Sequence, residues 1–235
     1  MSNKMQSNRY VFIYASVMVI LVALILSSAA TFLRPMQDRN VKIERMQNIL
    51  SSVNIVATRA EAEELFARYI VGSKVVNIQG DEIAGIAFDI DLSVEIRKPA
   101  EQRRLPLFIA QVDNQTFYII PVRGAGLWGP IWGFLSFKED LTTVFGANFD
   151  HASETPGLGS QIGDRDFEEQ FIGERIFDEE GNFAPIRVIR GGARLDDPHG
   201  VDAVSGGTIT SQGVDEMLLE GIGNYVSYFK KQQSL

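Results

Sequence analysis

Cysteine is absent from this chain of 235 residues, and histidine occurs only twice, as His151 and His199. Without cysteine the chain has no disulfide, no thiol nucleophile, no cysteine zinc site and no thiolate-bound iron–sulfur cluster of its own. With only two histidines, we expect no metal site. Positive charge is also scarce: 22 Lys and Arg against 30 Asp and Glu give a net charge of -8, which argues against nucleic acid as a partner.

Apolar residues, by contrast, make up 45% of the chain, which is enough for a packed core. Charged residues are missing from Tyr10–Leu33, which reads YVFIYASVMVILVALILSSAATFL. At about 1.5 Å per residue, a helix of this length spans about 36 Å and can cross a hydrocarbon core of about 30 Å. We predict a single transmembrane helix at 10–33. A cleaved signal peptide is the alternative, since Ser27–Ala30 has the small residues of a cleavage region, although the apolar part of a signal peptide is shorter.

The charges that flank this segment do not fix its orientation. Residues 1–9 contain Lys4 and Arg9 and no acid, but basic residues also follow the segment, between Arg34 and Arg45. A long domain can be translocated whatever its charge, and a domain without cysteine tolerates an oxidising compartment. We therefore expect a cytoplasmic tail at 1–9, an anchor in the inner membrane and a large periplasmic domain.

After the anchor, the spacing of apolar residues predicts helices first. The pattern from Val41 to Leu50 extends a helix to about Ser52. Thr58–Glu61 is a capping box for a further helix, which Gly72 is expected to end. This divides the chain after the anchor into a juxtamembrane helical region, 34–72, and a separate domain, 73–235.

The separate domain is expected to combine β-hairpins with helices. Strands are predicted at Lys74–Gln79 paired with Ile83–Asp91, at Leu107–Val112 paired with Thr116–Val122, at Trp132–Lys138 and at Ala184–Arg190. Arg97–Arg104 reads as a solvated basic loop, and 146–175 as loop-rich apart from a helix at Asp166–Ile172. Apolar residues from Val214 to Phe229 predict one C-terminal helix. Hairpins and helices without β-α-β alternation indicate an α+β fold.

A first glycine-rich motif, Gly124–Gly129, matches the G-x-G-x-x-G pattern of dinucleotide-binding folds. Those folds need a helix to begin directly after the motif, so that its N-terminus meets the pyrophosphate. Here an aromatic and aliphatic run follows, from Pro130 to Phe137, and predicts a strand. We therefore expect no NADH site on this chain and assign the glycines to a tight bend beside a ligand or a packed backbone.

Two further motifs each allow two interpretations. In His151–Gly159, the pair Pro156-Gly157 suits a type II turn, but the loop could also press Leu158 against a flat ring. Asp202–Ser211 lies at the start of the C-terminal helix, where free N–H groups favour a phosphate. The alternative there is a simple capping turn, with Thr210 or Ser211 as the cap.

Taken together, the motifs resemble a known family. Asp202 followed by Ser205-Gly206-Gly207-Thr208 resembles the flavinylation motif of membrane-anchored FMN-binding domains, except that the family often has Ala at position 207. Ile120–Gly133 and Glu154–Gly159 resemble segments of one subunit, designated C, of the sodium-translocating NADH:quinone oxidoreductase (Na+-NQR). The anchor, the length and the order of the motifs match that subunit over essentially the whole chain.

The resemblance implies an electron-carrying subunit with FMN bound through a phosphoester to Thr208. A magnesium-dependent flavin transferase outside the cytoplasm would make the bond and would read Asp202. The FMN would take electrons from an iron–sulfur centre and pass them to flavin in a neighbouring subunit, designated B. The whole complex, with further subunits designated A, D, E and F, would oxidise NADH, reduce ubiquinone and export sodium. This chain itself should carry no sodium, because its single span has no ionisable group.

The flavin ring is expected between Glu154–Gly159 and Gly124–Gly129, against apolar side chains. The expected cofactor-binding residues besides Thr208 are Asp202, Ser205, Gly206, Gly207, Gly126, Leu127, Trp128, Glu154, Thr155, Pro156, Gly157 and Leu158. Two alternatives stay open: the Rnf-complex subunit designated G, with the same cofactor in a ferredoxin:NAD complex, and a membrane-anchored scaffold without cofactor. The region Leu127–Pro130, and Ser205 in place of Thr, favour the Na+-NQR subunit.

Overall fold

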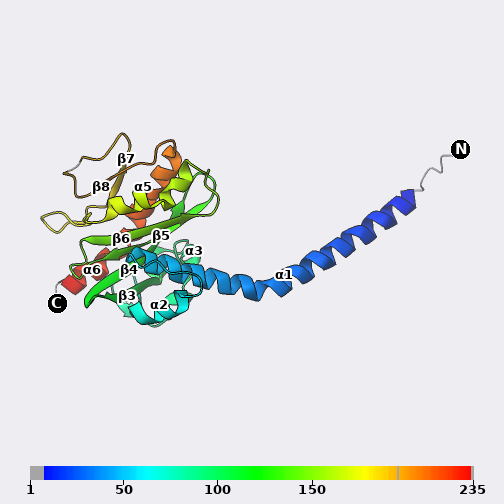
Figure 1. Ribbon diagram of the computed structural model, residues 1–235, viewed down its shortest axis with the longest axis horizontal. Coiled ribbons are helices and arrows are strands. Elements are labelled where there is room, and N and C mark those ends of the chain that lie inside the picture. Colours follow the sequence, from blue (N-terminus) through cyan, green and yellow to red (C-terminus); the bar gives the residue numbers. More distant parts are fainter. Residues whose placement is uncertain (1–7, 195, 234–235) are drawn as a thin grey trace. The chain divides into compact units, whose positions relative to one another are not determined.

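A computed structural model describes residues 8–194 and 196–233 (Figure 1). The chain divides into two units, 1–44 and 45–235. The expected cytoplasmic tail, 1–9, lies outside the described residues except for its last two. The first unit is formed by α1 (Asn8–Ser52), whose last residues belong to the second unit.

The helix α1 is continuous from the apolar segment to Ser52, which confirms the predicted extension of the helix. By length and composition it could cross a membrane, and none of its apolar segment is buried by the protein. Pro35 lies inside the helix and has no N–H group, so the carbonyl of Thr31 lacks its helical donor there. The helix α1 is therefore a candidate membrane anchor.

The second unit is built on an antiparallel sheet of six strands in the order β2-β1-β3-β4-β5-β6. The strands are β1 (Ile70–Val76), β2 (Glu82–Ile83), β3 (Leu105–Val112), β4 (Gln115–Ala125), β5 (Pro130–Phe137) and β6 (Val144–His151). The predicted hairpin of β3 and β4 is confirmed. Its turn residues Asp113 and Asn114 both have positive φ, 50° and 63°, as a type I′ turn requires.

Several predicted boundaries in this region were wrong. Gly72 does not end the helix α2 (Ala62–Tyr69); it lies in β1, next to a register shift. The strand expected at Ile83–Asp91 stops at Ile83 and is followed by a 3₁₀ turn, η1 (Ala87–Asp89). Strand β6 was missed, because its Gly, Asn and Asp have low strand propensity and pairing with β5 decides the conformation.

The segment at Arg97–Arg104 is held in place and is not a free loop. It follows the short helix α3 (Leu92–Glu95) and contains η2 (Ala100–Gln102). The buried carboxylate of Glu95 accepts hydrogen bonds from Lys98 Nζ at 2.8 Å and from Arg104 Nη2 at 2.9 Å. A buried carboxylate needs such partners, so the basic residues here neutralise a charge inside the domain.

The remaining elements cover the sheet. They are η3 (Gly159–Gly163), α4 (Arg165–Glu168), η4 (Glu169–Phe171), β7 (Arg187–Ile189), β8 (Gly200–Asp202), α5 (Thr208–Gly223) and α6 (Val226–Gln233). The helix expected at Asp166–Ile172 is confirmed as α4 and η4. The single C-terminal helix was wrong, because it is interrupted between α5 and α6. The strand expected at Ala184–Arg190 is the shorter β7, which pairs in parallel with β8.

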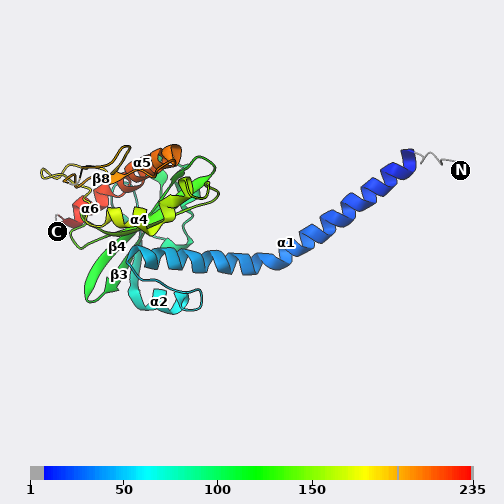
Figure 2. The same cartoon turned by 45° about the horizontal axis from the view of Figure 1, so that its top comes forward.

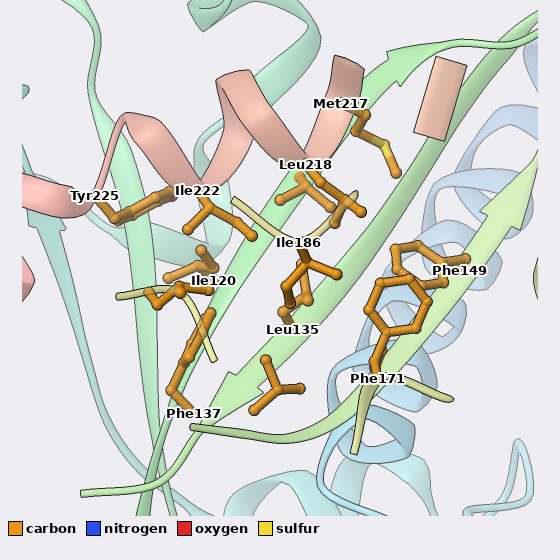
Figure 3. Close-up of a cluster of buried hydrophobic side chains, with 14 of the residues drawn as sticks. Ile120, Leu135, Phe137, Phe149, Phe171, Ile186, Met217, Leu218, Ile222 and Tyr225 are labelled. Atoms are coloured by element: carbon orange, nitrogen blue, oxygen red, sulfur yellow. The ribbon is translucent and has the colours of Figure 1, made fainter. Parts of the chain in front are cut away.

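Two hydrophobic cores lie on opposite faces of the sheet, with α5 over one face and α2 over the other (Figure 2). In the larger core, Leu218 and Ile222 of α5 point towards Ile120 of β4 and Leu135 of β5 (Figure 3). In the smaller core, the last turn of α1 contributes Ile49, and Val53 follows directly after the helix. This packing confirms the α+β fold and holds the start of α5 near the ends of β4 and β6.

Candidate functional site

The three glycine-rich motifs meet in one pocket at the start of α5. Its walls come from the β4–β5 loop, from the loop after β6 and from the first turn of α5. The lining residues are Leu127, Glu154, Thr155, Leu158, Gly159, Gly206, Gly207, Thr208, Ile209 and Thr210. Segments far apart in the sequence thus form a single site, as the three motifs together predict.

The β4–β5 loop forms the bend predicted from Gly124–Gly129. The N–H of Gly126 donates to the carbonyl of Gly129 at 2.8 Å, and β5 begins directly afterwards at Pro130. The predicted strand is therefore confirmed, and the helix that a dinucleotide-binding motif needs is replaced by a strand. Leu127 lines the pocket with an exposed side chain, whereas Trp128 is not among the lining residues.

The loop after β6 contains the type II turn predicted at Pro156-Gly157. Gly157 has a φ of 73°, and the N–H of Leu158 donates to the carbonyl of Thr155 at 3.1 Å. The same turn places Leu158 in the pocket wall, where its side chain stays 43% exposed. Both interpretations of this motif are thus compatible: the turn presents the leucine. Pro156 and Gly157 are exposed and do not line the pocket.

Thr208 is the first residue of α5, and its side chain is exposed at the pocket. Gly207 precedes it, and no side chain of the described residues caps the helix. Within the part of the chain that the structure describes, the N–H groups of Thr208, Ile209 and Thr210 have no acceptor. Free N–H groups at the positive end of a helix of this length suit an anion such as a phosphate.

The capping turn expected at Thr210 or Ser211 was wrong. The hydroxyl of Ser211 accepts a hydrogen bond from the N–H of Val204 at 3.0 Å, before the helix begins. The hydroxyl of Thr210 donates to Glu154 Oε2 at 2.6 Å, and Thr210 is only 1% exposed. Neither side chain closes the start of α5, so its N–H groups stay available for a ligand.

Glu154 lies in the pocket wall and is only 4% exposed. Its Oε1 accepts the N–H of Trp128 at 2.9 Å, while its Oε2 accepts the Thr210 hydroxyl. The motifs did not predict this pairing, since they suggested Thr210 only as a helix cap. The signal that could have indicated it is a lone acid between two glycine-rich segments.

Asp202 and Ser205 precede the start of α5 in the sequence. Asp202 ends β8 and is exposed, and its Oδ1 accepts the N–H of Ala193 at 2.6 Å. Ser205 is exposed in the turn before α5. Neither residue lines the pocket.

The residues present fit an amphipathic anion. Thr208 and the free N–H groups form a polar end for a phosphate, and Leu127, Leu158 and Ile209 offer exposed apolar side chains for a ring. Among the described lining residues the only acid is Glu154, and both of its oxygens already accept hydrogen bonds from the protein.

Comparison with known proteins agrees with this geometry. A family model described as "FMN-binding domain" matches residues 126–223, from the β4–β5 loop to the end of α5. NqrC of Haemophilus ducreyi, the subunit designated C of its Na(+)-translocating NADH-quinone reductase, is 30% identical over 233 residues, with 90% of each chain covered. The same subunit of Vibrio vulnificus is 32% identical over 209 residues, with 82% of each chain covered.

Solved structures give the same relationship. The crystal structure of this Na(+)-translocating NADH-quinone reductase subunit from Parabacteroides distasonis has a TM-score of 0.78 and 39% identity, covering 84% of this chain and 96% of that one. NqrC of Shewanella oneidensis has a TM-score of 0.69 and 25% identity, covering 83% and 100%. The chain therefore belongs to the NqrC family of Na(+)-translocating NADH-quinone reductase subunits.

Proposed function

We propose that this chain is the electron-transfer subunit of a sodium-translocating NADH:quinone reductase and that it carries FMN on Thr208 through a phosphoester bond. The observation that carries the proposal is the position of Thr208. Its exposed hydroxyl stands at the first residue of α5, beside three N–H groups without an acceptor among the described residues. A phosphate joined to that oxygen would meet the positive end of the helix.

The neighbouring threonine is a weaker candidate for the attachment. Thr210 is 1% exposed, and its hydroxyl is occupied by the hydrogen bond to Glu154. A transferase must reach the hydroxyl that it modifies and remove its proton. Accessibility therefore favours Thr208 over Thr210.

FMN bound in this way would supply electron transfer through its ring, while the protein supplies position and environment. Because the ester would join the phosphate, the ring would keep its own chemistry and depend on its neighbours for tuning. Leu127, Leu158 and Ile209 are the exposed apolar side chains that border the pocket. A ring held lightly against them suits a carrier that must meet two partners.

The role that we propose for this chain in the complex is the one that the resemblance to the family implies. In this proposal, the FMN receives electrons from an iron–sulfur centre and passes them to flavin in the neighbouring subunit designated B. The complex, which also contains the subunits designated A, D, E and F, oxidises NADH, reduces ubiquinone and exports sodium. The anchor would be α1, in the inner membrane, with the domain in the periplasm. The absence of charged residues in Tyr10–Leu33 leaves this helix without a group to carry sodium.

Thr208→Ala is the direct test. The full chain is produced together with the flavin transferase, and its intact mass and its flavin fluorescence in a denaturing gel are measured. We expect the wild type to carry the mass of FMN and Thr208→Ala to lose it while unfolding at the same temperature. Thr208→Val provides a second variant without a hydroxyl, and Thr208→Ser is the control that keeps one. Covalent FMN on a folded Thr208→Ala protein would refute the assignment.

A further inference from the structure

Glu154 joins two walls of the pocket by hydrogen bonds. Among the described lining residues, no other side chain does so. The carboxylate leaves the loop after β6, accepts the N–H of Trp128 in the β4–β5 loop, and accepts the hydroxyl of Thr210 in the first turn of α5. Both oxygens act as acceptors, which is the pattern of an ionised carboxylate. Three separate segments therefore meet at one side chain.

The backbone around Glu154 is shaped to hold the carboxylate. A Cβ atom added to Gly126 would collide with Oε1 of Glu154, and one added to Gly159 would lie 2.5 Å from Oε2. Only residues without a side chain allow the β4–β5 loop and the loop after β6 to approach the carboxylate so closely. Gly126 and Gly159, from two different motifs, thus both leave room for the carboxylate of Glu154.

The contacts of Glu154 reach the two ends of the pocket. Trp128, whose N–H it fixes, is adjacent to Leu127 of the apolar wall. Thr210, whose hydroxyl it fixes, lies in the same helical turn as Thr208 and the free N–H groups. A displaced carboxylate would therefore alter the spacing between the apolar wall and the start of the helix. An acid near a helix N-terminus is also favoured by the helix dipole.

We infer that Glu154 is a positioning residue of the FMN site: it holds the β4–β5 loop and the first turn of α5 in register, so that phosphate and ring are bound at a fixed separation. The inference rests on the proposed function, and it assigns Glu154 no contact with the reacting atoms. Charge-assisted hydrogen bonds are stronger and more directional than neutral ones, which suits this task.

Two pairs of variants in the full chain, produced with the flavin transferase, separate positioning from charge. Glu154→Ala removes both contacts, whereas Glu154→Gln can still accept from Trp128 N–H and donate to Thr210 Oγ1. Thr210→Val removes one contact and leaves the carboxylate in place, and Thr210→Ser restores the hydroxyl. The readouts are the covalent FMN by mass, the visible circular dichroism of the flavin, which reports how rigidly the ring is held, and the unfolding temperature.

Asp215→Ala is the matched control for general damage to α5. Asp215 lies on the same helix and accepts the N–H of Val188 at 2.9 Å, but it does not line the pocket. We expect this variant to lower the unfolding temperature and to leave the flavin dichroism unchanged. Such a result would show that the dichroism responds to the pocket and not to stability.

The expected result is that Glu154→Ala and Thr210→Val lose the flavin dichroism of the wild type, and that Glu154→Gln and Thr210→Ser recover it. Loss of covalent FMN from a folded Glu154→Ala protein, with recovery in Glu154→Gln, would support the same role. Unchanged dichroism in both Glu154→Ala and Thr210→Val would overturn it, and so would failure of Glu154→Gln with no effect of Thr210→Val. A wild type without FMN would instead refute the proposed function.

Discussion

Shortening Leu158 to alanine should change the flavin while hardly changing the fold. The side chain is 43% exposed, so its truncation removes only part of the ~1.5–3 kcal/mol that a fully buried leucine contributes. We expect a loss of about 1 kcal/mol in the free energy of unfolding, small against the total of roughly 5–15 kcal/mol typical of a domain. The phosphoester on Thr208 is not touched by this change, so the covalent FMN should remain.

The expected effect on the flavin has a direction. Leu158 lines the pocket, and its loss admits water to a position that an apolar side chain now occupies. Water stabilises the negative charge of a reduced flavin better than a leucine does. The reduction potential of Leu158→Ala should therefore be more positive than that of the wild type. A redox titration of the full-length flavinylated chain, followed by visible absorption, measures it.

Ile172→Ala is the matched control for this experiment. Ile172 is 48% exposed, close to the value for Leu158, but it lies beyond η4 and does not line the pocket. It should lose a similar amount of stability with no shift in potential. Leu127→Ala tests the opposite wall and should shift the potential in the same direction. If Leu158→Ala and Leu127→Ala both kept the wild-type spectrum and potential, the ring would not lie where we place it.

Three further changes test other parts of the site and the fold. Asp202→Ala should give folded protein with less FMN. The protein should stay folded because the carboxylate is exposed and accepts one hydrogen bond, from Ala193 N–H, worth about 1 kcal/mol. It should carry less FMN if the transferase recognises Asp202, and an unchanged rate of flavinylation, followed by mass, would contradict that recognition. Gly206→Ala should disturb the pocket more than Gly207→Ala, because Gly206 has a φ of 75° and its added Cβ would lie 2.6 Å from Leu158 Cδ2. Gly207 lies outside the positive-φ region, and the atom nearest to its added Cβ would be 3.2 Å away. Equal flavin dichroism in the two variants would contradict this prediction. Burial raises the pKa of Glu168 to about 7, so folding favours its protonated form, and the stability that this contributes is complete below about pH 4.5 and is lost as the pH rises through 7. Glu168→Gln should remove this loss of stability, which we put at ~1–2 kcal/mol after allowing for solvent screening. The free energy of unfolding is measured at pH 5 and at pH 8. An equal decrease between the two pH values in the wild type and in Glu168→Gln would contradict the prediction.

The sequence predicted the strands best where hydrophobic pattern and turn chemistry agree. The hairpin of β3 and β4 has apolar runs on either side of Asp113 and Asn114, which adopt positive φ readily. The strand β6 could not be predicted in this way, because Gly146, Asn148 and Asp150 carry no strand signal. Its conformation depends on pairing with β5, a partner that the local sequence does not reveal.

The interruption between α5 and α6 shows a different limit. Apolar residues continue at helical spacing from Val214 to Phe229, so the pattern alone predicts one helix. The helix is interrupted at Asn224 and Tyr225. The side chain of Asn224 accepts a hydrogen bond from Arg103 Nη1 at 3.1 Å, and the hydroxyl of Tyr225 donates to the carbonyl of Pro106 at 2.8 Å. Both partners are more than a hundred positions away in the sequence. Tertiary contacts of this kind override a helical pattern, and periodicity cannot anticipate them.

The glycines of the site were predicted to matter, but for an incomplete reason. From the sequence, three glycine-rich loops suggested that a ligand comes close to the backbone. In the structure, Gly126 and Gly159 make room for the carboxylate of Glu154, which belongs to the protein itself. A substitution at either glycine would displace that carboxylate from Trp128 N–H and Thr210 Oγ1 before it touched any ligand. Loss of FMN binding in a glycine variant would therefore be no evidence that the glycine contacts the flavin, and it has to be compared with Glu154→Gln before any contact is assigned.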